Sequence, residues 1–560
     1  MRSKYCIILL ILIMALLRYP LPANPVNVPV HHPVYNFLER METLGIVHNL
    51  LDGVRPYSRA KVARFLQVVD INKLRLTPID RRRLADYLLD FRYEIQPNKR
   101  NALVPEGQNW YSILAGVDNF KKDFVRFFRQ KHPEEENHVF LWEDGGDNFY
   151  FDYIQNATYE TRSNGDYRWA NWQQYRFRGL FNHNFGYQWE VVLHRILGDE
   201  PYALGHPILK GSWSQQRADE PRYSDRTRGE ISWNTGYVQL QFAQQEIEWG
   251  FGESGKLILS RDPEPYPYIS ISKEWGWGKF IALHGKLQSL AADTLENNLR
   301  LYPDKWVAAH RLEVSIKRRL TLGFSEHFIY GYRYADWAYL IPFNFYRAVQ
   351  HKLRDRDNAT IAIDFEWLAG FGSKIYGSVF LDEFRRSKLG TNWFGNKHAF
   401  LFGFYKTDPF GLANLNLRME YAALMPWVYT HKYGINSYTT DGQSLGHWAG
   451  PNSELYYIHI NKYWHQRLVT GIKWRQYKHG DNFADKNIGG DILLGHRSFD
   501  PQERQFLDGL LTTEQRLECY VHYELFNDLF LRGRYNYIDS NEPNIHRIYH
   551  EFYMGFEMRY

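Results

Sequence analysis

The 560-residue sequence predicts a mainly β protein, a transmembrane antiparallel β-barrel of about 18 strands preceded by a small N-terminal α-helical bundle. Three observations predict this class. First, apolar and polar residues alternate in runs from Phe149 to Tyr560. Second, short links between these runs take turns with long links along the chain. Third, the last run ends on an aromatic residue. Aromatic residues make up 17% of the chain, which fits the girdles that such barrels carry at both membrane interfaces.

The composition excludes several other classes of protein. Hydrophobic residues make up 44% and charged residues 23%, as in ordinary folded proteins, so a disordered chain is excluded. Two cysteines are too few for a disulfide scaffold or a multi-cysteine metal site. The net charge of +5 is spread along the chain and gives no case for nucleic-acid binding. Beyond residue 20 no apolar run is long enough for a helical membrane span, but strands can still span.

Residues 1–23 have the layout of a secretory signal peptide. Arg2 and Lys4 precede the apolar run 5–17, and a helix-breaking stretch then ends on the small residue Ala23. We expect cleavage near Ala23. Cys6 lies inside the apolar run, so a lipoprotein anchor is not expected. An uncleaved anchor is the alternative, but the run is short for a stable span. The expected destination is the outer membrane of a Gram-negative-type cell.

Residues 24–100 are expected to form a periplasmic helical segment. Phe37, Leu38, Met41 and Leu44 follow helical spacing, and Gly45 ends that helix. Ser58 is the expected N-cap of a second helix. Thr77 and Pro78 supply the cap and the first residue of a third. Residues 101–148 connect this segment to a barrel that we place at 149–560.

The alternation assigns residues to the two faces of each strand. Arg311, Glu313 and Lys317 alternate with Leu312, Val314 and Ile316. In a barrel the apolar set faces lipid and the charged set faces the lumen. A soluble sandwich would show the same alternation, so this pattern alone does not distinguish the two folds.

The links between the predicted strands separate a barrel from a soluble sandwich. Short turns on one rim and long loops on the other are typical of outer-membrane barrels. The short links are His183–Phe185, Asn234–Thr235, Gly276–Gly278, Arg318–Arg319, Asp408–Ala413 and Asn527–Asp528. The long links are Gly198–Asp225, Gly250–Tyr266, Ala291–Ala308, Arg333–Asn358, Tyr429–Ser453 and Lys478–Thr512.

The C-terminal residues form the most specific local signal. Phe552, Phe556 and Tyr560 fall on one face of the last predicted strand, and the chain ends on Tyr560. This strand resembles the terminal strand by which barrel-insertion machinery recognises its substrates. An ordinary edge strand is the alternative interpretation.

Several stretches together resemble the Wzi capsule-assembly family of outer-membrane proteins. They are Pro33–Ile46, Arg55–Arg59, Glu248–Gly252, Leu257–Ser260, Pro265–Ser270, Gln350–His351, Asp357–Asn358 and Leu381–Phe384. The resemblance covers nearly the whole mature chain, although each motif is short. It implies an 18-stranded barrel with a small periplasmic helical bundle. It also implies a lectin-like surface role, known in at least one branch, in retaining capsular polysaccharide.

No constellation of residues argues for catalysis, for a metal or for a cofactor. The lumenal faces carry both signs of charge, which favours a lumen of paired charges over a one-signed channel. Asp364 and Glu366 could suggest glycoside hydrolysis, but alternate positions on one wet strand face explain them more simply. The histidines show no metal-ligand spacing, and no G-x-S-x-G motif appears.

Function is expected in the long loops, which carry aromatic residues beside amides and carboxylates. Aromatic faces stack on the C–H patches of sugars while polar groups bind their hydroxyls. The expected glycan-binding residues are Trp306, Trp337, Tyr339, Trp393 and Trp448. The alternative for each is membership of the outer aromatic girdle.

Two functions therefore remain. The first is an outer-membrane protein, not an enzyme, that binds capsular or other extracellular polysaccharide and helps to assemble or retain it. Its other expected partners are outer-membrane lipid and the barrel-insertion machinery. The second is a porin-like diffusion channel. A filled lumen would support the first function and an open pore the second.

Overall fold

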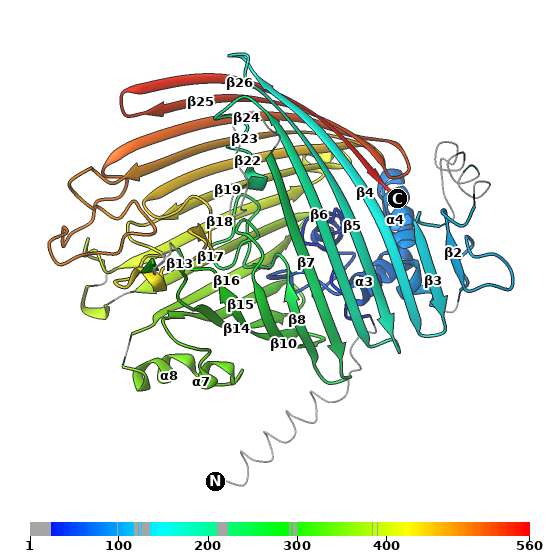
Figure 1. Ribbon diagram of the computed structural model, residues 1–560, viewed down its shortest axis with the longest axis horizontal. Coiled ribbons are helices and arrows are strands. Elements are labelled where there is room, and N and C mark those ends of the chain that lie inside the picture. The colour runs from blue at the N-terminus through cyan, green and yellow to red at the C-terminus, as the bar shows by residue number, and fades with distance from the viewer. Residues whose placement is uncertain are drawn as a thin grey trace, which may run out of the picture.

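The computed structural model describes residues 24–560 apart from 98, 117–120, 122–124, 126–134, 210–221, 291–292, 295–299, 355, 384 and 389. Its strands form one closed antiparallel barrel (Figure 1), which confirms the predicted class. The eighteen strands of the ring, counted over the described residues, are β4 (Asp147–Arg162), β5 (Tyr167–Phe181), β6 (Phe185–Gly198), β7 (Arg222–Asn234), β8 (Gln239–Gln244), β10 (Pro267–Trp275), β11 (Gly278–Leu287), β14 (Lys305–Ile316), β15 (Leu320–Gly331), β16 (Asn358–Gly370), β17 (Ser373–Glu383), β18 (Lys397–Thr407), β19 (Leu415–Leu424), β22 (Ser453–His465), β23 (Leu468–Asp481), β24 (Leu510–Phe526), β25 (Leu529–Glu542) and β26 (Ile545–Arg559).

The barrel closes where its last strand pairs with its first. Phe556 of β26 lies opposite Ala157 of β4, and the ladder runs from Glu551 to Arg559. Closure satisfies the backbone groups that an open sheet edge would expose to lipid. Among the described residues, no helix is both long enough and apolar enough to cross a membrane.

The predicted rims of short and long links are present. Short turns such as 276–277 and 527–528 lie on one rim, while loops such as 332–357 and 482–509 lie on the other. Two links on the long-loop rim depart from the strict alternation, because 163–166 and 543–544 are themselves short. In outer-membrane barrels the short-turn rim is periplasmic and the long-loop rim extracellular.

The predicted facing of β14 holds for the strand itself. Leu312 and Ile316 are each 41% exposed on the outer face, whereas Arg311 and Glu313 are fully buried in the lumen. Lys317 is a correction. The alternation predicts that Lys317 faces the lumen, but it lies in the exposed turn after β14 with a φ of 52°. The chain must reverse there to begin β15, so the strand alternation ends at Ile316.

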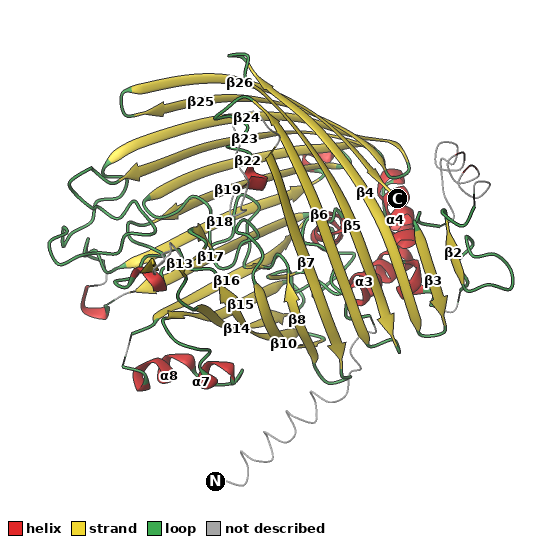
Figure 2. Ribbon diagram, in the orientation of Figure 1, coloured by secondary structure: helices red, strands yellow, loops and turns green. Residues whose placement is uncertain are grey.

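The N-terminal segment forms helices at the predicted places. They are α2 (Val34–Thr43), α3 (Arg59–Ile71), α4 (Pro78–Asp90) and the short α5 (Arg92–Ile95). The Ser58 hydroxyl accepts from the Lys61 amide and begins α3, and Thr77 does the same for Asp80 at the start of α4. Figure 2 shows the helices of this plug, as we call residues 24–95, at one end of the barrel behind β4–β6.

The plug is held at the short-turn rim by polar contacts. Arg40 of α2 pairs with Asp80 at 3.1 Å and with Asp408 of a short turn at 2.9 Å. Asn49 donates to the carbonyl of Gly276 in another short turn. These contacts place the helices on the short-turn side of the barrel.

Residues 101–148 widen the sheet beside the ring. They contribute β2 (Trp110–Ser112) and β3 (Phe140–Asp144), and β3 pairs with the first residues of β4.

Candidate functional site

One long loop enters the lumen and reaches the plug. Residues 245–266 connect β8 to β10 at the long-loop rim, yet their strand β9 (Glu248–Trp249) pairs with β1 (Val54–Arg55) of the plug. The Trp249 side chain is fully buried. The loop therefore crosses the lumen and reaches the plug.

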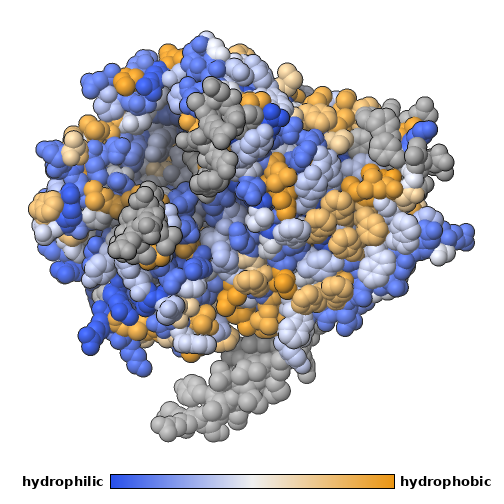
Figure 3. Space-filling model, in the orientation of Figure 1, coloured by the Kyte–Doolittle hydropathy of each residue, from blue (hydrophilic) through white to orange (hydrophobic). Residues whose placement is uncertain are grey.

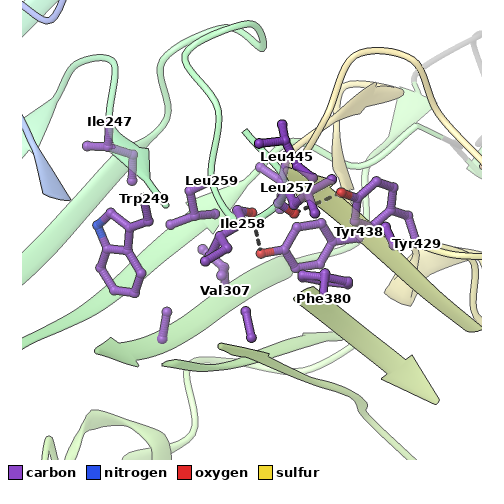
Figure 4. Close-up of a cluster of buried hydrophobic side chains, with 14 of the residues drawn as sticks. Ile247, Trp249, Leu257, Ile258, Leu259, Val307, Phe380, Tyr429, Tyr438 and Leu445 are labelled. Atoms are coloured by element: carbon purple, nitrogen blue, oxygen red, sulfur yellow. Dashed lines mark hydrogen bonds between the residues drawn. The ribbon is translucent and has the colours of Figure 1, made fainter. Parts of the chain in front are cut away.

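A second long loop, 425–452, packs on the first. The Tyr429 hydroxyl donates to the carbonyl of Leu257 at 2.8 Å, and the Tyr438 hydroxyl donates to that of Ile258 at 2.8 Å. Figure 4 shows both tyrosines reaching the first loop beside Phe380 of the barrel wall. Both hydroxyls are buried but hydrogen-bonded, so the contact avoids the free-energy cost of burying an unpaired polar group.

These loops occupy one side of the lumen. The wall that faces them is apolar, with inner residues such as Val307 of β14, Phe380 of β17 and Leu401 of β18 in one buried cluster. Burial of this cluster fixes the two loops against β10–β19 and leaves the opposite wall without such a cover.

The opposite wall is polar and rich in arginine. We define the arginine wall as six side chains on the inner face of the barrel. They are Arg162, Arg168, Arg226, Arg475, Arg516 and Arg534. They extend from β4, β5 and β7 to β23, β24 and β25, which adjoin through the closure of the ring. Arg516 and Arg534 keep 33% of their side-chain surface exposed, unlike the fully buried Arg311 on the other side. Figure 3 shows a hollow at the upper left with hydrophilic surface around it.

Arginines outnumber the carboxylates that pair with them. Glu514 accepts from Arg475 at 2.5 Å and lies 3.5 Å from Arg516. Glu160 likewise forms ion pairs with Arg168 at 2.7 Å and with Arg534 at 3.6 Å. Each of these carboxylates is thus shared between two guanidinium groups. The two remaining pairs of the wall are Arg162 with Glu551 and Arg226 with Glu264.

The excess of positive charge affects a nearby loop histidine. His206 lies in the loop after β6, and its pKa is lowered to about 4 by burial and then by the charges of Arg168, Arg226 and Arg534. A neutral histidine at this place adds no further charge at pH 7. Arg516 and Arg534 each keep a third of their side-chain surface exposed. The wall therefore offers positive charge to an anionic ligand.

Trp448 adjoins this wall. Its ring lies 4.7 Å from the Arg475 guanidinium carbon, and its indole nitrogen donates to the Ser254 carbonyl at 2.6 Å. Trp393 lies apart, in the loop before β18. Its side chain is half-buried, and its backbone forms an isolated antiparallel β-bridge with Glu503. Arg385 lies over its ring at 5.1 Å.

The other three predicted glycan residues lie together on the outer face of the barrel. Trp306 donates to the carbonyl of Arg333, and Tyr339 is fully buried against Tyr330 of β15. Trp337 is 83% exposed. The structure thus does not gather the five aromatic residues into one site.

The C-terminal residues lie where β26 meets β4. Phe552 and Phe556 are exposed on the outer face. The backbone of Tyr560 exchanges two hydrogen bonds with Tyr153, at 2.6 and 2.7 Å.

Asp364 and Glu366 take part in ion pairs beneath the plug. Asp364 accepts from Arg311 at 2.6 Å, and Glu366 accepts from Lys374 at 2.8 Å. Neither carboxylate is accessible, since both are buried. In the part of the chain that the structure describes, no group of three acidic, histidine or cysteine side chains is placed to hold a metal ion.

Sequence reasoning missed the arginine wall. Alternation assigns Arg516 and Arg534 to the lumen, but it does not show which part of the lumen the loops leave open. Two-residue strands such as β9 carry no periodic signal, so the entry of the loop was not predictable.

Comparison with known proteins agrees with this architecture. A family model described as capsule assembly protein Wzi matches residues 140–548. A similar solved structure is Wzi of Escherichia coli, described as a carbohydrate-binding β-barrel involved in group 1 capsule assembly. The two chains share 13% identity over 95% of this chain and 99% of that one, with a TM-score of 0.57, which shows a common fold. OprD, an outer-membrane protein of Pseudomonas aeruginosa, has a TM-score of 0.41 at 10% identity, over 74% of this chain and 93% of that one. No curated protein matches the sequence.

Proposed function

Because the chain belongs to the Wzi capsule-assembly family of outer-membrane proteins, we propose that it binds an acidic extracellular polysaccharide and helps to retain it on the cell surface. The observation that carries this proposal is the arginine wall, which is partly exposed beside Trp448 on the side of the lumen that the loops leave uncovered.

The chemistry of this wall suits an acidic sugar polymer. Guanidinium groups bind carboxylates through two parallel hydrogen bonds, and an arginine that shares its carboxylate partner has donors left to offer. The Trp448 ring supplies an apolar surface for the C–H face of a sugar. Its indole nitrogen is already bonded to Ser254, so the ring is held in place before any ligand arrives.

The plug and the loop that meets it inside the lumen weigh against the diffusion channel. A solute passing from rim to rim would have to displace the pairing of β9 with β1 or pass the plug contacts at the short turns. The pairs of opposite charge inside the barrel also differ from the one-signed lining of a selective pore.

We further propose binding without cleavage. The carboxylates closest to the wall arginines, such as Glu160 and Glu514, are each held between two guanidinium groups. Their oxygens are therefore engaged in ion pairs within the protein, whereas glycoside hydrolysis needs two carboxyl groups that both reach the sugar bond.

Export and insertion belong to the same proposal. We propose that residues 1–23, which lie outside the described residues, are cleaved as a signal peptide. We also propose that Phe552, Phe556 and Tyr560 form the signal read by the barrel-insertion machinery. The outward position of the two phenylalanines leaves them available to another protein before the barrel closes.

The proposal is tested by polymer retention on encapsulated cells. The variant Trp448→Ala/Arg475→Gln/Arg516→Gln should release capsular polysaccharide into the medium while the barrel still assembles. Arg532→Gln is the matched control. Arg532 is an inner-face arginine of similar exposure, but it pairs with Glu557 near the short-turn rim. Equal retention by the triple variant and the parent would contradict the proposal.

A further inference from the structure

The loop between β15 and β16 folds over the outside of the barrel. We call residues 332–357 the outer-wall segment, and it contains α7 (Trp337–Leu340) and α8 (Tyr346–Lys352). Figures 1 and 2 show both helices outside the sheet, beside β14 and β15. The residues of β14 that contact these helices lie on the opposite face of the strand from those that face the lumen. Val307 and Ala309 belong to the lumenal cluster, whereas Ala308 packs in another cluster with Tyr339 and Tyr346 of the outer-wall segment.

The outward-facing residues of β14 and β15 change from apolar to ionisable where the segment begins to cover them. Leu312 and Phe324 face outward as a cross-strand pair, each 41% exposed. The next outward pair is His310 with Glu326, whose charged groups lie 3.1 Å apart. Glu326 is almost fully buried, and the Tyr346 ring lies 4.5 Å from the His310 ring. The segment therefore covers a polar pair on the face that lipid covers elsewhere.

The depth of this pair places the segment within the membrane. Glu326 is six residues from the first residue of β15 at the short-turn rim. A tilted strand climbs roughly 15 Å over that length. The apolar band of an outer-membrane barrel is about 25 Å tall. An ionisable pair facing acyl chains at this height would be costly, so the segment takes the place of lipid there.

The outward face of the segment is itself apolar. Trp337 is 83% exposed and Phe343 is 79% exposed, with Ile341 and Phe345 also exposed beside them. Phe343 stacks on Phe280 of β11 at 5.2 Å. Phe280 lies opposite Leu312, so the apolar surface of the segment continues the lipid-facing surface of the barrel.

Basic side chains follow the apolar ones. Arg347, Lys352, Arg354 and Arg356 are exposed, and none pairs with a carboxylate among the described residues. The nearby Asp357 is already held by Arg333 at 2.7 Å. Exposed cations next to a lipid-facing surface are placed to meet phosphate-bearing headgroups.

We propose that the outer-wall segment lies in the outer leaflet and binds an anionic lipid with a phosphate-bearing headgroup. Trp337, Phe343 and Phe345 contact acyl chains, and Arg347, Lys352 and Arg354 contact phosphate. Trp337 then serves this lipid contact, and Trp306 and Tyr339 hold the segment on the barrel, in place of the glycan contact that loop composition suggested. The inference is independent of polysaccharide binding.

The apolar part is tested by spin labels on the full-length protein in phosphatidylcholine nanodiscs. Phe343→Cys and the control Phe499→Cys are labelled in a Cys519→Ser background. Phe499 is 75% exposed in the loop 482–509. The label at 343 should be accessible to oxygen and shielded from a water-soluble nickel complex, and the label at 499 should show the reverse. Equal access of the nickel complex to both labels would overturn the lipid contact.

The phosphate part is tested by native mass spectrometry with lipid A as the probe. Arg347→Gln/Lys352→Gln/Arg354→Gln should reduce the bound fraction at least fivefold. The control Lys317→Gln/Arg318→Gln/Arg319→Gln removes three exposed cations from the turn at the opposite rim and should leave binding unchanged. Equal loss in both variants, or no loss in the first, would refute a phosphate site in the segment.

Discussion

Val54 of the plug lies directly opposite Trp249 of a loop that starts from the other rim of the barrel. The pairing spans the lumen, because the plug is anchored at the short turns and the loop leaves from the long-loop side. Two segments from opposite rims thus meet in a small sheet inside the barrel. This contact obstructs the passage between the two rims.

The first prediction concerns conductance. Replacement of residues 245–266 by a short Gly-Ser linker removes β9 and the surface on which loop 425–452 packs. The variant should show large steady conductance in planar bilayers, whereas the parent should show little. Replacement of residues 385–396 is the control, since none of the described residues of that loop forms a strand pair with the plug. Large steady conductance of the parent would favour the channel function.

The second prediction concerns Glu39, which joins the plug to the barrel wall. Its carboxylate pairs with Lys374 at 2.6 Å and with Arg418 at 2.8 Å. Burial alone would raise the pKa of Glu39, but the charges of Arg418 and Lys374 outweigh it and hold this pKa below the ordinary value. Glu39→Gln removes the negative charge that pairs with Lys374 and Arg418. The substitution should lower the free energy of unfolding by about 3–5 kcal/mol.

The pH dependence of this loss has a definite sign. A carboxylate whose pKa is lower in the folded state stabilises that state fully at pH values above the ordinary glutamate pKa of about 4.3. This stabilisation disappears as the pH falls through the folded-state pKa. The difference between parent and Glu39→Gln in urea unfolding should therefore be constant above about pH 4.3 and narrow below it. Glu106→Gln, at an exposed position, should match the parent throughout. A difference that widens on acidification would refute the assigned ion pairs.

The third prediction concerns the lipid-facing side of β14. Leu312→Arg places a charge on the outer face and should cost roughly 2–4 kcal/mol near the bilayer midplane. Gln174→Arg changes a half-buried inner position of β5 and should cost far less. Ser315 is unsuitable as the inner control, because its hydroxyl donates to Asn49 of the plug at 2.7 Å. Heat-modifiable migration on gels measures assembly, and equal tolerance of the two arginines would argue against the assigned facing.

The fourth prediction concerns insertion. Tyr560→Ala keeps the backbone hydrogen bonds to Tyr153 and removes only the terminal aromatic ring. The variant should be depleted from outer membranes. Tyr553→Ala, which removes an inner-face ring from the same strand, is the control. Normal surface exposure of Tyr560→Ala would count against a recognition role.

Most of the barrel could be predicted from sequence because its signals are local. The alternation around Leu312 and the caps at Ser58 and Thr77 act within a few residues. The filling of the lumen depends on contacts between distant segments, such as Tyr438 with Ile258, which leave no periodic pattern. The outer-wall segment did leave a signal. His310 falls on the lipid-facing side of its own strand, where an ionisable residue requires a cover.

The central claim is tested most directly by the affinity of the purified protein for capsular polymer. Single sugar contacts are weak, so a polymer that spans several protein copies on a surface should bind well and short oligosaccharides poorly. Binding should weaken as salt rises, because the arginine wall is partly exposed to solvent. We expect Trp448→Ala/Arg475→Gln/Arg516→Gln to lose polymer binding at least tenfold and Arg532→Gln to keep it. Unchanged binding by the triple variant, or equal affinity for oligosaccharide and polymer, would contradict polysaccharide retention through the arginine wall.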